Sequence, residues 1–427
     1  MTRDTIFALS SGALPAGIAV VRVSGPNASQ ALEKLCGKLP EARRAVSATL
    51  RWHDGMLDRA LILWLPGPGT ATGEDVAEFH LHGGRAVVAS VLAALGALPG
   101  LRVAEPGEFT RRAFSNGKLD LAQAEGLADL LAAETEAQRR QALRQAEGGL
   151  GRLVGGWRER LLGLAARAEA AIEFAEDEDD VPALAPGDLA GMASLAADME
   201  AALRQPPAER LRDGVRIVVA GPTNAGKSSL INVIAGREAA IASPIAGTTR
   251  DLIEIPLAIG DMPCLLIDSA GLREGGGQIE QIGMARARTA IESADLILWL
   301  GPPDRCPDRD RSILVQSKAD LGKPPGGGTV DVATSTVTGE GLDALRGLLE
   351  SRVRTLLPPA DGIALNARHR ERIAEAAEEL RAAAGQYDIL FAAEHLRQAR
   401  IALDRITGRA GVEEMLDALF GRFCIGK

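Results

Sequence analysis

The sequence predicts a multidomain α/β protein with an N-terminal α+β domain, a discontinuous helical domain and an inserted domain built on a mainly parallel sheet. The chain of 427 residues is too long for one typical hydrophobic core. Short apolar runs alternate with helix-like stretches in residues 1–117 and again in residues 213–352. Residues 118–212 and 353–427 instead carry apolar side chains three and four positions apart, as amphipathic helices do.

The N-terminal domain is expected to be α+β because its strand-like runs are short and separated by turns. Two such runs, at residues 18–23 and 61–65, are rich in Val, Ile and Leu. The stretch 66–73 (PGPGTATG) is a strong turn signal.

The helical pattern of residues 119–203 is interrupted by an acidic run, residues 173–180, which we expect to be a solvated loop. The helical pattern returns after Pro358 and Pro359. We therefore interpret residues 213–352 as an insertion into a helical domain.

Strands of the inserted domain are predicted by four short apolar runs, VRIVVA, CLLID, LILWL and ILVQS. Such runs are typical of strands that are buried on both faces of a parallel sheet.

Composition narrows the function classes. The chain is 46% hydrophobic and 25% charged, as globular proteins are. No stretch offers the ~20 uninterrupted apolar residues of a membrane span, and the N-terminus lacks an export signal, so we expect no membrane contact and a cytoplasmic location. The net charge of −9 argues against a broadly basic surface, but not against a local basic groove. The scattered cysteines predict neither a zinc site nor a disulfide framework.

The strongest motif runs from Gly221 to Ser228 and fits GxxxxGK(S/T), between a predicted strand and a predicted helix. Its glycines let backbone N–H groups surround phosphates at a helix N-terminus. Lys227 is expected to reach the β- and γ-phosphates, and Ser228 to bind Mg²⁺.

Three further motifs follow in order. In residues 245–251 (IAGTTRD), Thr249 is expected to be a second Mg²⁺ ligand. In the next motif, DSAG, Asp268 is expected to contact the metal through a water molecule. In SKAD, Asp320 is suited to accept the guanine N1 and N2 hydrogens, which favours GTP over ATP. The predicted nucleotide-contacting residues are Asn224, Ala225, Gly226, Lys227, Ser228, Ser229, Ser243, Pro244, Ile245, Ala246, Gly247, Thr248, Thr249, Asp268, Ser269, Ala270, Gly271, Ser317, Lys318, Asp320, Ser335 and Thr336.

These motifs resemble the translation-factor-related GTPases, and Asn224 with IAGTTRD resembles their potassium-dependent branch. The resemblance implies a K⁺ ion held by Asn224, Ser243, Ile245 and Thr248. Such a cation neutralises charge that develops during phosphoryl transfer, as an arginine finger does. Asn224 is also a residue type that favours turns, so a purely local role stays open.

Sequences outside this domain resemble the MnmE (TrmE) family of tRNA modification GTPases. They are DTI (4–6), RVSG (22–25), TGED (72–75), HGG (82–84), PGEFTRRAF (106–114), NGKLDLAQAE (116–125) and FCIGK (423–427). The resemblance implies a homodimer that forms a heterotetramer with the flavoprotein MnmG and acts on tRNA. It also implies GTP-controlled addition of a carboxymethylaminomethyl or aminomethyl group to the wobble uridine.

The same resemblance implies a tetrahydrofolate one-carbon derivative bound by Arg22, Glu78, Lys118 and Lys427. Basic groups suit the carboxylates of folate, and a carboxylate suits pterin N–H donors. Taken singly, each of these residues would favour a surface ion pair over a folate contact.

The predicted catalytic residues are Lys227, Asp268 and Glu280. The family places a water-orienting glutamate where Glu280 stands, although a role in capping the next helix stays open. Cys424 is a candidate nucleophile, but no neighbouring histidine or cluster of basic residues is visible in the sequence to activate it.

Three positions depart from the family pattern: Ser269 stands for threonine, Ser317 for asparagine and Thr336 for alanine. Serine at 317 is expected to weaken guanine affinity, and with Thr336 to raise the GTP dissociation constant about tenfold. Two other functions remain open from the sequence: a ribosome-assembly GTPase and a regulatory nucleotide switch.

Overall fold

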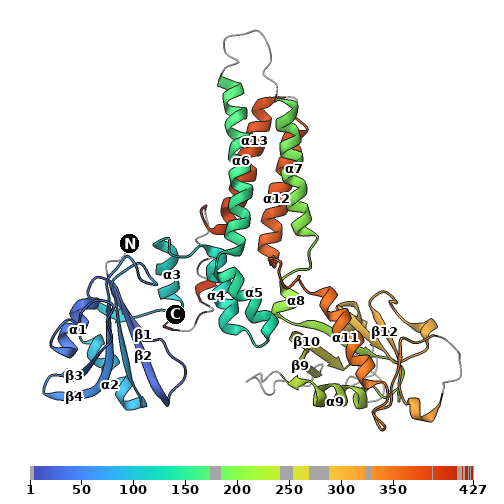
Figure 1. Ribbon diagram of the computed structural model, residues 1–427, viewed down its shortest axis with the longest axis horizontal. Coiled ribbons are helices and arrows are strands. Elements are labelled where there is room, and N and C mark those ends of the chain that lie inside the picture. Colours follow the sequence, from blue (N-terminus) through green and yellow to red (C-terminus); the bar gives the residue numbers. More distant parts are fainter. Residues whose placement is uncertain are drawn as a thin grey trace, which may run out of the picture. The chain divides into compact units, whose positions relative to one another are not determined.

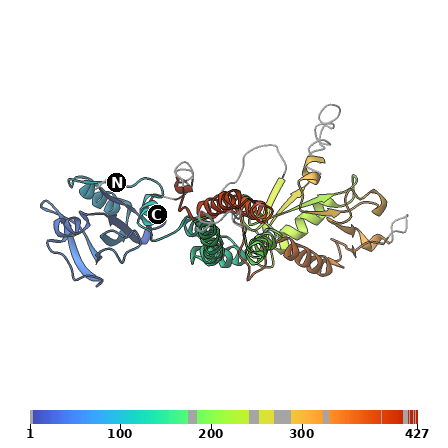
Figure 2. The ribbon, with the colours of Figure 1, turned by 90° about the horizontal axis from the view of Figure 1, so that it is seen from above.

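The computed structural model describes residues 4–173, 184–240, 253–268, 288–322, 329–386, 388–410, 416, 419–421, 423 and 425–426. It divides into two compact units, Met1–Ala128 with Asp404–Lys427, and Asp129–Leu403. Figures 1 and 2 show the elements of each unit from two directions. Within the described part of the chain, no helix is long and apolar enough to cross a membrane.

The first unit contains a six-stranded sheet in the order β3-β4-β5-β2-β1-β6. Its strands are β1 (Thr5–Leu9), β2 (Ala16–Ser24), β3 (Val46–Trp52), β4 (Gly55–Leu65), β5 (Val76–Gly83) and β6 (Leu101–Val103). Neighbours are antiparallel except β1 and β6. The apolar runs at 18–23 and 61–65 are strands β2 and β4, as predicted.

Helices α1 (Ala28–Cys36) and α2 (Arg85–Gly96) cover one face of this sheet. Alternate residues of β2 and β5, among them Val21 and Phe79, form the core beneath them. Side chains at the intervening positions therefore point to the opposite face. On that face, Phe109 of α3 (Glu108–Ser115) packs with Ile6 and Ala8.

Near the chain end, Phe420 and Phe423 pack against Leu121 and Ala124 of α4 (Leu121–Ala132). Ile425 forms a bridge with Pro106. Phe420, Phe423 and Ile425 are thereby attached to earlier parts of the chain inside one compact unit.

The second unit combines helices with a second sheet. Its helices α5 (Glu136–Ala146), α6 (Gly149–Glu173), α7 (Pro186–Leu203) and α8 (Glu209–Arg212) precede the sheet, and α12 (Ala367–Ala384) and α13 (Ile389–Thr407) follow it. Helix α12 packs along α7 (Figure 1), with an ion pair of 2.6 Å between Arg381 and Glu200. The helical layer is thus assembled from both sides of the insertion, as predicted.

The seven-stranded sheet has the order β13-β12-β11-β7-β10-β9-β8. Its strands are β7 (Val215–Ala220), β8 (Ala239–Ala240), β9 (Ile253–Ile259), β10 (Met262–Asp268), β11 (Leu296–Trp299), β12 (Ser312–Gln316) and β13 (Val332–Ala333). β8 and β9 are antiparallel to their neighbours and the other pairs are parallel. Helices α9 (Lys227–Arg237) and α11 (Leu342–Leu356) pack on the sheet.

The predicted fold class is confirmed, including the four strands expected from apolar runs. The domain limits at residues 117, 212 and 352 stay predictions.

Candidate nucleotide-binding site

The loop between β7 and α9 has the backbone shape of a phosphate-binding loop. Gly221, Asn224 and Gly226 have φ values of 151°, 62° and 87°, the region that favours glycine and tolerates asparagine. At Gly221 a Cβ atom would lie 3.0 Å from the backbone of Leu300, so only glycine fits there without a shift. The loop ends on Gly226, the residue before α9, where free helix amides favour an anion.

Lys227 is only 6% exposed. Its Nζ donates hydrogen bonds to the carbonyl oxygens of Gly221 (3.1 Å) and Pro222 (2.8 Å). These bonds hold the ammonium group over its own loop, where it adds a positive charge to the helix N-terminus. The arrangement suits a polyphosphate.

Ser228 and Asp268 meet at the same edge of the sheet. β7 and β10 are parallel with Asp268 opposite Val219, so both carboxyl ends lie together. The Oγ of Ser228 donates to Oδ2 of Asp268 at 3.3 Å. Hydroxyl and carboxylate oxygens, completed by phosphate and water oxygens, fit Mg²⁺. Among the described residues no group of His, Cys, Asp or Glu forms a metal site by itself.

The SKAD segment is attached directly to the phosphate-binding loop. Oγ of Ser317 donates to the carbonyl oxygen of Ala225 at 2.5 Å, and Nζ of Lys318 donates to that of Asn224 at 2.9 Å. Lys318 has a φ of 57°, in the left-handed region that few non-glycine residues adopt. The serine that departs from the family pattern therefore keeps a hydrogen bond between the two segments.

Asp320 and Ser335 lie in the same part of the domain. Asp320 is exposed on the short 3₁₀ helix Ala319–Leu321. The backbone N–H of Ala319 donates to the carbonyl oxygen of Thr334 at 3.0 Å, which joins this helix to the loop after β13. Buried Ser335 accepts hydrogen bonds from the amides of Val337 and Thr338, both at 3.2 Å, and so shapes that loop. Thr336 is half-buried beside it.

Ser229 is exposed on α9. The predicted residues of this site that still remain lie outside the described residues. They are Ser243, Pro244, Ile245, Ala246, Gly247, Thr248, Thr249, Ser269, Ala270, Gly271 and Glu280. Cys424 and Lys427 also lie outside the described residues. Their roles stay predictions.

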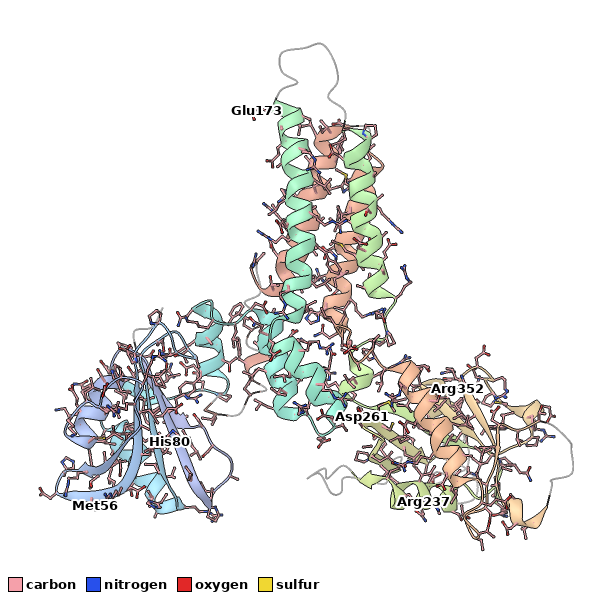
Figure 3. All side chains as sticks on the ribbon, viewed as in Figure 1. Met56, His80, Glu173, Arg237, Asp261 and Arg352 are labelled. Carbon is pink, nitrogen blue, oxygen red and sulfur yellow. The ribbon has the colours of Figure 1, made fainter. Side chains whose placement is uncertain are left out.

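Two of the predicted folate contacts form an ion pair on the sheet face away from α1 and α2. Nη2 of Arg22 (β2) lies 2.9 Å from Oε1 of Glu78 (β5), its strand-register partner. The other carboxylate oxygen of Glu78 is 3.1 Å from Nε2 of His80, labelled in Figure 3. The guanidinium of Arg22 lies 6.0 Å from the ring centre of Phe109. Lys118 is exposed, and its side chain lies beside the backbone of Gly73 in the TGED loop.

The sequence did not reveal the ion pairs that connect the motifs of the N-terminal domain. Arg112 of PGEFTRRAF is 11% exposed and binds Asp4 (2.9 Å), Glu74 (3.2 Å) and Glu108 (3.0 Å). Burial acts to raise the pKa of the Glu108 carboxyl, but hydrogen bonds from Arg102 and Arg112 outweigh it and hold that pKa below its ordinary value. The motifs DTI, TGED and PGEF thus meet in one ion cluster. Their charges were visible in the sequence, but their contact was not.

Burial disfavours the thiolate form of two cysteines. Burial raises the pKa of the Cys36 and Cys264 thiols to about 12. A thiol that stays protonated at neutral pH is a poor nucleophile, since the thiolate is the reactive form.

Comparison with known proteins covers the whole chain. Residues 5–118 match the family model described as GTP-binding protein TrmE N-terminus, and residues 121–424 match the one described as MnmE helical domain. The tRNA modification GTPases MnmE of Erythrobacter litoralis and Rhizorhabdus wittichii are both 56% identical to this chain. Each alignment covers 99% of this chain, and 100% and 97% of the respective relative. That of Novosphingobium aromaticivorans is 54% identical, over 99% of this chain and all of the relative.

Proposed function

Because the chain belongs to the MnmE family of tRNA modification GTPases, we propose that it couples GTP hydrolysis to modification of the wobble uridine of certain tRNAs. The observation that carries this proposal is the combination of whole-chain similarity with an ordered phosphate-binding loop around Lys227. The product is a carboxymethylaminomethyl or aminomethyl group at C5, installed in the cytoplasm with the flavoprotein MnmG.

Hydrolysis is proposed to use the residues at the joined ends of β7 and β10. Amides at the start of α9 and the Lys227 ammonium bind the β- and γ-phosphates. Mg²⁺ held through Ser228 and Thr249, with Asp268 behind a water, would neutralise phosphate charge. Glu280 orients a water that attacks the γ-phosphorus. The bond between the γ-phosphorus and the bridging oxygen of the β-phosphate breaks. GDP, inorganic phosphate and a proton leave.

Two further groups shape this site. K⁺ bound by Asn224, Ser243, Ile245 and Thr248 would supply the positive charge of an arginine finger. Asp320 selects guanine by accepting its N1 and N2 hydrogens. Ser317 and Lys318 support that selection by attaching the SKAD segment to the phosphate-binding loop.

The N-terminal unit is proposed to hold the folate one-carbon donor and to form the homodimer. Arg22 and Glu78 place a charge-assisted donor and acceptor side by side, as a ligand with both carboxylates and pterin N–H groups requires. Lys118 and Lys427 add positive charge. MnmG and tRNA complete the complex.

Reconstitution with purified components tests this function. The chain, MnmG, GTP, Mg²⁺, K⁺, a tetrahydrofolate one-carbon derivative, a nitrogen donor and unmodified tRNA are combined, and the tRNA is digested to nucleosides for mass spectrometry. The modified wobble uridine is expected only in the complete mixture. Unmodified uridine in a mixture that hydrolyses GTP would refute the tRNA role and leave the GTPase activity standing.

A further inference from the structure

Helix α5 forms two hydrogen bonds with the turn between β9 and β10. This turn lies at the end of β10 opposite the nucleotide site. The backbone N–H of Ala137 donates to the carbonyl oxygen of Asp261 at 3.2 Å. Nη2 of Arg140 donates to Oδ2 of the same aspartate at 2.9 Å. Figure 3 labels Asp261 beside this helix. We call these two contacts the α5 clasp.

The clasp uses groups that a helix end leaves available. Thr135 is the N-cap of α5, so the amide of Ala137 has no acceptor within its own helix. The carbonyl of Asp261 satisfies it, and the Asp261 carboxylate lies where the helix dipole favours negative charge. Arg140 is 48% exposed and Asp261 35% exposed, so this ion pair alone contributes little stability. Its geometry is therefore better suited to positioning the turn than to stabilising the fold.

Strand β10 joins the clasp to the metal end of the nucleotide site. Asp261 immediately precedes β10, and Asp268, its last residue, accepts from Ser228. β9 and β10 pair without a register break from Met262 to Asp268. The connecting turn has only two residues, with Gly260 at a φ of 64° as a tight hairpin requires. Asp261 and Asp268 are seven residues apart, so the hairpin spans about 23 Å between them at about 3.3 Å per residue.

Helix α5 also contacts both chain segments that enter and leave the inserted domain. Nε2 of Gln138 donates to the carbonyl oxygen of Arg212 at 3.1 Å, and Arg144 lies 3.4 Å from Asp361. Next to these polar contacts is a cleft of about 280 Å³, lined by Arg140, Leu211, Met262 and Leu357 among others. The contact between helix and inserted domain is therefore specific but incompletely packed, which leaves room for movement.

We propose that Arg140 and Asp261 are positioning residues that couple the nucleotide state at Asp268 to the helical segment through β10. The inference rests on the proposed GTPase function of the site. Coupling between two sites is reciprocal. Binding of a magnesium–nucleotide complex at Ser228 and Asp268 therefore changes the hold of α5 on the turn, and loss of the clasp changes how the site responds to Mg²⁺.

Hydrogen exchange of the α5 amides tests the proposal in the full chain. Exchange is measured with GDP and with a non-hydrolysable GTP analogue, both with Mg²⁺, for the wild type, Arg140→Gln and Asp261→Asn. In the wild type we expect the two nucleotide states to differ at least about fivefold in α5 exchange rate, the lower end of typical coupling. Both variants are expected to lose most of this difference while still binding nucleotide.

Arg139→Gln is the matched control. Arg139 is the neighbouring arginine of α5, 51% exposed, and its guanidinium pairs with Glu136 of the same helix. This variant should keep the wild-type difference. A second readout is the Mg²⁺ concentration at half-maximal GTP hydrolysis, which the two clasp variants should raise and Arg139→Gln should not.

Two results would overturn the coupling: equal α5 exchange in both nucleotide states of the wild type, or an unchanged difference in Arg140→Gln and Asp261→Asn. A wild-type chain that binds the analogue but does not hydrolyse GTP would instead contradict the proposed function, and the exchange data would still decide on the clasp.

Discussion

The hydroxyl of Ser317 lies 2.5 Å from the carbonyl oxygen of Ala225, so the SKAD segment and the phosphate-binding loop are joined by a direct hydrogen bond. The family pattern has asparagine at this position, and the sequence alone suggested a loosened base site. The shorter serine reaches the loop, and its Cβ lies 3.6 Å from the place a Cβ of residue 226 would occupy, an ordinary contact distance. Glycine at 226 is favoured instead by its φ of 87°.

Ser317→Ala should weaken binding of guanine nucleotides. The loss of one hydrogen bond, about 1 kcal/mol, raises the dissociation constant of GDP about fivefold to tenfold. The ratio of GDP to ADP affinity should stay constant, because Asp320 selects the base. Titration with fluorescent nucleotides measures both values. A dissociation constant equal to that of the wild type would show that the Ser317–Ala225 bond does not support the site.

GTP hydrolysis should be faster in K⁺ than in Na⁺, and Asn224 should be needed for the difference. Asn224 has a φ of 62°, so Asn224→Gly removes the side chain without straining the backbone. We expect this variant to bind nucleotide but to hydrolyse GTP equally slowly in both salts. Phosphate release assays at equal ionic strength measure the rates. Equal rates for the wild type in both salts would contradict the potassium site.

Arg22→Ala should weaken folate binding without affecting GTP hydrolysis. The change removes the guanidinium beside Glu78, a charge-assisted contact worth roughly 1.5–3 kcal/mol when the partner is also desolvated, so the dissociation constant should rise at least about tenfold. Isothermal titration with a tetrahydrofolate derivative measures it. Arg44→Ala is the control, since Arg44 is 72% exposed and pairs with the equally exposed Glu41. A parallel loss of affinity in both variants would argue against a specific contact.

Acid should destabilise the first unit through Glu108. The folded-state pKa of this carboxyl is lowered, so its stabilising contribution is present above its ordinary value of 4.5 and is lost as the pH falls below it. Glu108→Gln removes charged hydrogen bonds, at a cost of roughly 1–3 kcal/mol at neutral pH, and should flatten the dependence of the melting temperature between about pH 5 and 3. Glu33→Gln, on the exposed side of α1, should keep the wild-type pH profile. Melting curves recorded across this range decide between the two behaviours.

The parts of the fold that sequence predicted best are those whose residues act locally. The run VRIVVA followed by GxxxxGKS specifies strand, loop and helix within 14 neighbouring positions, Val215 to Ser228. Each glycine of the motif permits a backbone conformation that the loop itself needs, so no distant contact is required to recognise it. Strand β9 was not predicted: Pro256 interrupts its apolar pattern, and only pairing with β10 makes it a strand. The conformation of residues 253–259 is therefore set by pairing with β10 and not by local sequence preference.

Contacts between distant segments were beyond sequence reasoning for the same physical reason. Arg112 and Asp4 are separated by more than a hundred residues, and nothing in either motif indicates the other. Arg22 and Glu78 were both named as ligand contacts, but their mutual ion pair appears only once β2 and β5 are in register. The clasp between Arg140 and Asp261 likewise depends on how α5 packs against β10.

The central claim, that GTP hydrolysis by this chain drives tRNA modification, is tested most directly in a bacterium lacking its own MnmE. The strain is supplied with the wild-type chain or with Lys227→Ala, and tRNA nucleosides are analysed by mass spectrometry. Lys227 is the buried cation of the phosphate-binding loop, so its loss should abolish hydrolysis. We expect carboxymethylaminomethyl or aminomethyl uridine with the wild type and none with Lys227→Ala. Equal modification by both, or none with the wild type at normal expression, would contradict it.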